Sequence, residues 1–170
     1  MSEDTQPAKT PAPRRKGGGS TGKSRRGRPE VDLDGLADHL GYLIRRAQLW
    51  VFEDFARTLA PLDIRPAQYS VMTVVSANPG LTQTSVGVAL GIERARLVYL
   101  LDELEGRGFV TRKACATDRR SHALHLTAEG RKALVRIRAL VKEHEGRLAE
   151  KVGIEEHRML VRMMAVFAKG

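Results

Sequence analysis

Residues 81–110 have the sequence LTQTSVGVALGIERARLVYLLDELEGRGFV, which predicts two short helices joined by a tight turn. Thr82 is a typical N-cap residue for the first helix, and Gly91 suits the left-handed position that ends it. Leucines at helical spacing give the second helix one apolar face. The side chains left free on this second helix are Glu93, Arg94, Arg96 and Tyr99. Two such helices, the second with a basic solvent face, are typical of a helix-turn-helix.

The sequence after Gly108 predicts a β-hairpin, because the apolar residues now alternate with other residues. The segments FVTRK (109–113) and HALHLT (122–127) have the pattern of antiparallel strands, with Leu124 and Leu126 on one side of the second. The loop between them carries two adjacent arginines. A hairpin behind a helix-turn-helix is a wing, whose cationic tip can enter the minor groove of DNA.

Two helices are predicted before this region. An apolar stripe at helical spacing runs from Asp32 to Leu59 and stops at Pro61. Pro66 then suits the first position of a short buried helix, which ends at the turn signal NPG (78–80). The first helix carries apolar residues on more than one face, so we expect it to bury a second surface against a partner subunit.

Two further helices are predicted after the hairpin. Thr127 is a suitable N-cap for a long helix at 128–152, and a shorter, methionine-rich helix follows at 155–168. Long terminal helices around a small centre cannot all bury their stripes within one subunit, so we expect a two-fold homodimer. The expected organisation is an arm at 1–30 and one domain at 31–170, with dimerisation helices at 31–60 and 128–170 around a winged helix-turn-helix at 66–127.

Composition narrows the class of protein. The 170 residues carry a formal net charge of +9, which favours a polyanionic partner. A single cysteine excludes an internal disulfide and a cysteine-rich zinc site. There is no apolar run of about twenty residues and no apolar signal core at the N-terminus, so we expect a cytoplasmic protein with no membrane partner.

Residues 1–30 contain eight basic and three acidic side chains among many glycines and prolines, and have too little apolar surface to fold. GGGSTGKS (17–24) matches the P-loop pattern, but its proline-rich upstream flank cannot form the buried strand of a nucleotide site, so we interpret it as a linker. RGRP (26–29) resembles the core of an AT-hook, which makes Arg26 and Arg28 candidates for minor-groove contact. An ordinary basic tail is the alternative.

Three motifs resemble the MarR family of dimeric winged-helix regulators, over nearly the whole chain from about Leu36 to Phe167. They are LTQTSVGVALGI (81–92), LVYLLDELEGRGFV (97–110) and DRRSHALHLTAEG (118–130), in this order and spacing. The resemblance implies a mainly α fold with a small β-wing. It also implies a transcription factor, usually a repressor, that binds a pseudo-palindromic operator as a dimer and is released by a small effector.

The resemblance also assigns positions. In the family the wing-tip aspartate steadies the arginine that enters the minor groove, and Asp118 and Arg120 occupy these places. Two features depart from the family pattern: Gly87 stands where alanine is usual, and the arm is unusually long. The candidate DNA-binding residues are Thr82, Gln83, Glu93, Arg94, Arg96, Tyr99, Arg112, Lys113, Asp118, Arg119, Arg120 and Ser121, with Arg26 and Arg28 of the arm.

Arg94 and Arg96 are the strongest candidates for base recognition, because side chains at the N-terminal end of a recognition helix reach furthest into the groove. Bidentate contacts to guanine and simple phosphate contacts both remain open for them. The alternative function is a non-specific architectural DNA-binding protein that uses its arm and charge without an effector.

The family places its effector between the dimer helices and the winged domain. The residues that would line this crevice are Arg45, Arg46, Trp50, Phe52, Tyr69 and Met72. Arginines beside aromatic rings suit an aromatic carboxylate or an acyl-CoA thioester, although each residue could instead belong to the core or the surface.

Redox and metal chemistry have weaker support. The basic neighbours Arg112 and Lys113 could activate Cys115, but the chain has no second cysteine to pair with it. The five histidines lack metal-ligand spacing and no catalytic constellation is present, so we expect no metal, no cofactor and no enzymatic activity.

Overall fold

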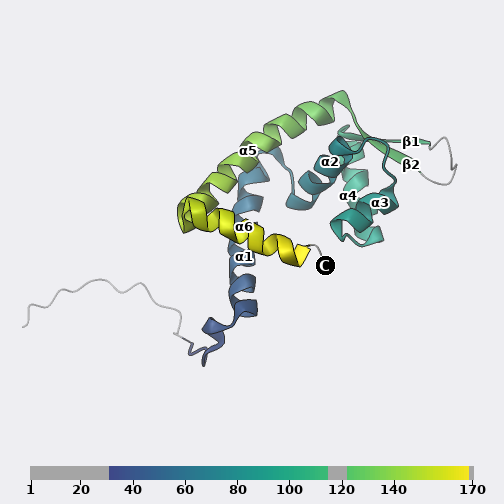
Figure 1. Cartoon of the computed structure of the whole chain (residues 1–170). Coiled ribbons are helices and arrows are strands. Elements are labelled where there is room, and N and C mark those ends of the chain that lie inside the picture. The colour runs from purple at the N-terminus through teal and green to yellow at the C-terminus, as the bar shows by residue number, and fades with distance from the viewer. Residues whose placement is uncertain (1–30, 115–121, 169–170) are drawn as a thin grey trace, which may run out of the picture.

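A computed structural model describes residues 31–114 and 122–168 (Figure 1). Helices dominate, and within the described residues the only sheet is a two-stranded antiparallel hairpin. The predicted fold class, mainly α with a small β-wing, is confirmed. The elements are η1 (Leu36–Asp38), α1 (Leu40–Leu59), η2 (Ala60–Leu62), α2 (Pro66–Ala77), α3 (Gln83–Leu90), α4 (Arg94–Gly106), β1 (Val110–Ala114), β2 (His122–Leu126), α5 (Ala128–Val152) and α6 (Ile154–Ala168).

The hydrophobic core lies where α2, α4 and the first half of α5 meet the hairpin. Figure 1 shows α2, α3, α4 and the hairpin gathered at one end of the molecule, with α5 running from the hairpin to α6. Helix α1 packs against α5 and reaches α2 through η2. The fully buried core side chains include Val71, Met72 and Val75 of α2, Leu101 and Leu104 of α4, Leu124 of β2, and Leu134 and Ile137 of α5.

The first helix starts later than predicted. The sequence predicts one helix from Asp32, whereas the structure has a turn, a short 3-10 helix and then α1 from Leu40. The Asp32 carboxylate accepts a hydrogen bond from the backbone N–H of Asp34, and Gly35 follows with φ of 77°. A left-handed residue cannot be part of a right-handed helix, so the apolar pattern begins several residues before the helix does.

Helix α3 begins and ends at the predicted residues. The Thr82 hydroxyl accepts a hydrogen bond from the backbone N–H of Ser85 at 3.2 Å and caps α3. Gly91 has the left-handed conformation, with φ of 60°. At Gly87 an added Cβ would lie 3.3 Å from both the Ile92 carbonyl oxygen and a Leu97 methyl carbon. This glycine, which departs from the family's alanine, therefore allows α3 to pack closely against the turn and α4.

The hairpin is also present, with β1 at Val110–Ala114 rather than the predicted 109–113. Val110 pairs with Leu126, and both are buried. Strand β2 is fixed to the chain before α3, because Leu124 exchanges backbone hydrogen bonds with Gly80 and Leu81 at 2.9 Å each.

A compact junction joins the hairpin to α5. The Thr127 hydroxyl accepts a hydrogen bond from the backbone N–H of Gly130 at 2.9 Å, which confirms the predicted cap, and donates one to the Gly108 carbonyl at 2.6 Å. The Thr127 backbone N–H donates to the Phe109 carbonyl at 3.0 Å. A Cβ on Gly130 would overlap that carbonyl oxygen and lie 2.8 Å from its carbon. Backbone therefore occupies the space that a side chain at position 130 would need.

Replacing Gly130 with alanine should lower the free energy of unfolding by roughly 1 to 3 kcal/mol, because the Phe109 backbone must move to accept the methyl group. Urea unfolding at a fixed protein concentration measures this change. The matched control is Gly146→Ala on the same helix, where an added Cβ meets no heavy atom within 4 Å. The control should gain up to about 1 kcal/mol from helix propensity. Equal effects of the two substitutions would contradict the steric explanation.

Candidate functional site

The start of α4 presents the residues predicted to read DNA. Arg94 and Arg96 are exposed there. Glu93, predicted to be a free side chain, instead caps the helix by accepting hydrogen bonds from the backbone N–H groups of Ala95 and Arg96 at 3.0 and 3.2 Å. These two donors hold the pKa of the Glu93 carboxyl below its ordinary value. The negative charge of Glu93 is thus directed at the helix backbone, and the two arginines form the cationic end of α4.

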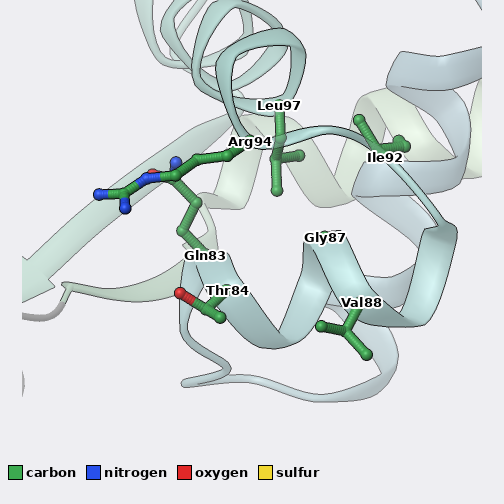
Figure 2. A pocket seen from close by; sticks show the side chains of 7 residues that line it. All are labelled: Gln83, Thr84, Gly87, Val88, Ile92, Arg94 and Leu97. Carbon is green, nitrogen blue, oxygen red and sulfur yellow. The ribbon is translucent and has the colours of Figure 1, made fainter.

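A groove of about 200 Å³ lies between α3 and α4 (Figure 2). Figure 2 shows the Arg94 side chain extending from the start of α4, with Gln83 of α3 beside it at the same end of the groove. The remaining lining residues are Thr84, Gly87, Val88, Ile92 and Leu97. The fold therefore brings Gln83 and Arg94, from two predicted DNA-binding segments, to one polar edge.

Two other predicted DNA-binding residues are held by contacts within the protein. The Tyr99 ring is exposed, and the Arg65 guanidinium lies 5.5 Å from its centre. The side chain of Arg112 is only 21% exposed and forms ion pairs with Asp102 and Glu105 of α4. The charge of Arg112 is therefore already paired within the protein, and its predicted contact with DNA stays a prediction.

The remaining candidates in the arm and near the hairpin loop lie mostly outside the described residues. Lys113 is described and exposed at the end of β1. The residues that lie outside the described part of the chain are Arg26 and Arg28 of the arm, and Cys115, Asp118, Arg119, Arg120 and Ser121 of the hairpin loop.

The candidate effector residues do not all lie on one face of the protein. A helix turns by about 100° per residue, so Arg45 and Phe52 share one face of α1, and Arg46 and Trp50 share another. Met72 is fully buried in the core. Its inclusion among the candidate effector residues stays a prediction, because helical spacing alone could not reveal which side of α2 faces the core.

The junction of α1 and α5 contains a buried polar cluster that the sequence did not reveal. Asp54 and His144 are 5% and 2% exposed. One carboxylate oxygen of Asp54 lies 2.7 Å from Nδ1 of His144 and accepts a hydrogen bond from Arg147 at 2.9 Å. The other accepts from Arg57 at 2.8 Å. An ionised carboxylate only accepts hydrogen bonds, so Nδ1 of His144 carries the hydrogen.

The charge of Asp54 is stabilised despite its burial. Hydrogen bonds from His144, Arg147 and Arg57 hold the pKa of the Asp54 carboxyl far below its ordinary value and outweigh the opposing effect of burial. The only available signal in the sequence was an aspartate among buried positions of α1, with its partners 90 and 93 residues away.

Aromatic side chains surround this cluster. The Phe55 ring stacks on His144 with centres 4.8 Å apart and meets the edge of Tyr69 at 5.9 Å. On α1 as well, Trp50 lies beneath Lys151, whose ammonium is 4.7 Å from the ring centre. Trp50 and Tyr69, two candidate effector residues, thus sit beside the α1–α5 junction.

Within 31–114 and 122–168, no three histidine, cysteine, aspartate or glutamate side chains are grouped to hold a metal ion. The helices of this described part also lack the length and apolar character that crossing a bilayer requires.

Known proteins resemble this chain in sequence and in structure. A model of the MarR family matches residues 62–121. A putative transcriptional regulatory protein for the hcr operon of Thauera aromatica is 31% identical over 149 residues, covering 84% of this chain and 90% of that protein. The transcriptional repressor CouR bound to a 23-mer DNA duplex is 46% identical with a TM-score of 0.79, covering 82% of this chain and 99% of that one. CouR bound to p-coumaroyl-CoA is 43% identical with a TM-score of 0.75, covering 82% and 98%.

Replacing Asp54 with asparagine should lower the free energy of unfolding by about 2 to 3 kcal/mol at pH 7, because the buried His144 loses a charged acceptor and Arg57 and Arg147 lose their counterion. The native carboxyl has a depressed pKa, so its stabilisation is complete above the pKa of an unfolded aspartate, near 4, and declines below it. The difference between wild type and variant should therefore be constant from pH 6 to about 5 and shrink as the pH falls further to about 2.5, in urea unfolding at one protein concentration.

The control for Asp54→Asn is Glu53→Gln, its exposed neighbour, which is 4.0 Å from Arg57. That change should alter stability by less than about 0.5 kcal/mol. A stability difference for Asp54→Asn that stays constant from pH 6 down to about 2.5 would show that the cluster does not stabilise the protein through the charge of Asp54.

Proposed function

The chain belongs to the MarR family of transcriptional regulators, and we propose that it is a homodimeric repressor released from its operator by an aromatic acyl-CoA thioester. The observation that carries this proposal is the similarity to CouR, at 46% identity in a DNA-bound structure and 43% in one bound to p-coumaroyl-CoA. The basic start of α4 supports DNA recognition, because it is exposed and already capped by Glu93.

Recognition of DNA would begin with α4 in the major groove. Arg94 and Arg96 offer guanidinium groups that suit the two acceptors on the edge of guanine, and Gln83 offers an amide beside Arg94. Thr82 and the N-terminal end of α3 suit a phosphate contact. The hairpin and the basic arm would add contacts to the minor groove and to phosphate.

Dimerisation is supported by the apolar surface of the terminal helices. No residue of α6 is buried within the described chain, although the helix is rich in methionine and other apolar residues. Helix α1 likewise leaves Leu40 and Leu43 exposed. Such surface is the mark of an interface. A two-fold dimer would place the two copies of α4 about one DNA turn apart, as a pseudo-palindromic operator requires.

The effector would bind beside the α1–α5 junction. The aromatic side chains Trp50, Phe52 and Tyr69 suit the aryl group of an acyl-CoA, and Arg45 and Arg46 suit its phosphates. Tyr69 lies on α2, and the other four residues occupy different faces of α1. A ligand that contacts all five must therefore extend around α1 or contact both subunits. Free aromatic acids lack the phosphates and would satisfy fewer of these groups.

Release needs two conformations with different spacing of the recognition helices, of which the effector prefers the one that does not fit the operator. Helix α5 is suited to couple the two sites. It begins at the Thr127 junction behind the hairpin and carries His144 and Arg147 at the cluster with Asp54. A shift of α1 against α5 would therefore reach the winged domain.

Fluorescence anisotropy tests the proposed effector class. The protein should prefer DNA from its own promoter region over a scrambled duplex by a factor on the order of 10³ at physiological salt. Addition of p-coumaroyl-CoA should weaken binding to the promoter DNA, whereas free p-coumarate and CoA alone should have little effect, because each supplies only part of the ligand. Equal binding to both duplexes and indifference to the thioester would support the architectural alternative.

Replacement of Arg96 with alanine tests the mode of DNA reading. We expect a selection assay to show relaxed preference at one base-pair position in each half-site, with a loss of about 1 to 3 kcal/mol of discrimination. Arg138→Ala, which removes an exposed arginine from α5, is the control and should leave the preferred sequence unchanged. A uniform loss of affinity for all sequences after Arg96→Ala would indicate a phosphate contact instead.

A further inference from the structure

One arginine of strand β1 forms ion pairs with the recognition helix. Arg112 lies in the middle of β1, opposite Leu124 of β2. Its guanidinium donates hydrogen bonds to Glu105 at 2.5 Å and to Asp102 at 2.6 Å. Its backbone N–H donates to the second carboxylate oxygen of Glu105 at 3.1 Å. Asp102 and Glu105 are three residues apart on α4, so they share the helix face that β1 contacts.

The two strands of the hairpin are held in different ways. Strand β2 is tied through backbone hydrogen bonds between Leu124 and the segment before α3. The edge of strand β1 that does not pair with β2 faces α4. There the backbone N–H of Arg112 donates to the side chain of Glu105 and not to another strand. The start of β1 is held to α4 by a backbone hydrogen bond from Phe109 to the Leu104 carbonyl at 2.9 Å. Further along β1, at Arg112, the link to α4 is a bridge made of side chains. A small rotation of β1 about Arg112 displaces the residues beyond it, and the displacement increases with their distance from Arg112, which grows by about 3.3 Å per residue.

The charges of the bridge also matter for DNA binding. Two carboxylates on a recognition helix oppose the phosphate backbone, and the single guanidinium of Arg112 cannot fully neutralise both. If Arg112 left them to bind phosphate, both carboxylates would lose their partner. The geometry favours retention of the bridge, because Arg112 is only 21% exposed and both of its terminal nitrogens are already used.

We propose that Arg112 is a positioning residue for operator recognition, which sets the angle between the wing and α4 through Glu105 and Asp102 and does not itself bind DNA. This inference rests on the proposed DNA-binding function. It assigns a role in recognition to two acidic residues that, by charge alone, would weaken binding to DNA.

The sign of the effect of Glu105→Gln on affinity tests the proposal. The variant keeps an oxygen for the Arg112 N–H but loses the charge that holds the guanidinium. We expect Arg112→Gln and Glu105→Gln each to weaken operator binding roughly five- to tenfold, the size of one lost base-pair contact. If Arg112 instead binds phosphate, Glu105→Gln would free it and remove a negative charge, so affinity would stay equal or rise. That result would overturn the proposal.

The place of the loss on the DNA provides a second readout. Hydroxyl-radical footprints of both variants should lose protection in the minor grooves that flank the half-sites, while methylation protection in the major groove persists. Full protection at the flanks with unchanged affinity would reduce the bridge to a purely structural role and overturn the proposal. Circular dichroism melting of each variant establishes that the protein used for binding is folded.

Two further proteins complete the design. The exchanged pair Arg112→Glu with Glu105→Arg keeps the net charge and should recover part of the affinity lost by Arg112→Glu alone. Glu129→Gln removes a carboxylate of α5 that is paired with Lys132 and Arg136 rather than with the hairpin, and should not weaken binding. If neither wild type nor any variant prefers the operator over scrambled DNA, the proposed function itself is refuted. If wild type binds the operator normally and Glu105→Gln binds it equally well, only the role of the bridge is refuted.

Discussion

The structure depends on a carboxylate that is buried between two long helices and must remain ionised. Asp54 would be strongly unfavourable at this position without partners, because an isolated charge in a protein interior loses its hydration. Three cationic or hydrogen-bonding side chains, from Arg57, His144 and Arg147, hold it in place. Each interaction is directional, so α1 and α5 can slide or rotate against each other only by breaking charged hydrogen bonds. An apolar contact of similar area would permit many nearby registers, whereas this cluster favours one.

A related arrangement fixes the recognition helix at both ends and along one face. Glu93 caps its start, and near its end Arg107 donates to the Leu62 carbonyl in the connection from α1 at 3.0 Å. Along its length, Arg65 pairs with Glu103, which also accepts a hydrogen bond from the buried Gln68 at 3.2 Å. Polar and charged groups from the segment that joins α1 to α2 and from the start of α2 thus orient one face of α4, while leucines hold its opposite face in the core. Arg94 and Arg96 at its start form no ion pair among the described residues, so they are available for the proposed contact with DNA.

Local signals made the centre of the fold predictable. Thr82, Gly91 and Thr127 each act within a few residues of the chain, so their preferences identify caps and turns directly from sequence. The start of α1 was missed because apolar spacing says nothing about the left-handed turn at Gly35. The Asp54 cluster and the Arg112 bridge were missed because they depend on side chains that meet only after folding. The burial of Met72 and Tyr69 was also not predictable from spacing alone, since both lie on α2 but only Met72 is fully buried.

The contact between Lys151 and Trp50 gives the protein an internal spectroscopic probe. Trp50 is the single tryptophan of the chain, so the whole indole emission comes from one position beside the α1–α5 junction. An ammonium group 4.7 Å from the ring centre and partial access to water both influence the excited state of the indole. Any movement of the end of α5 relative to α1 changes both conditions together. The natural chain can therefore report its own conformational equilibrium in solution, without an attached dye and without DNA.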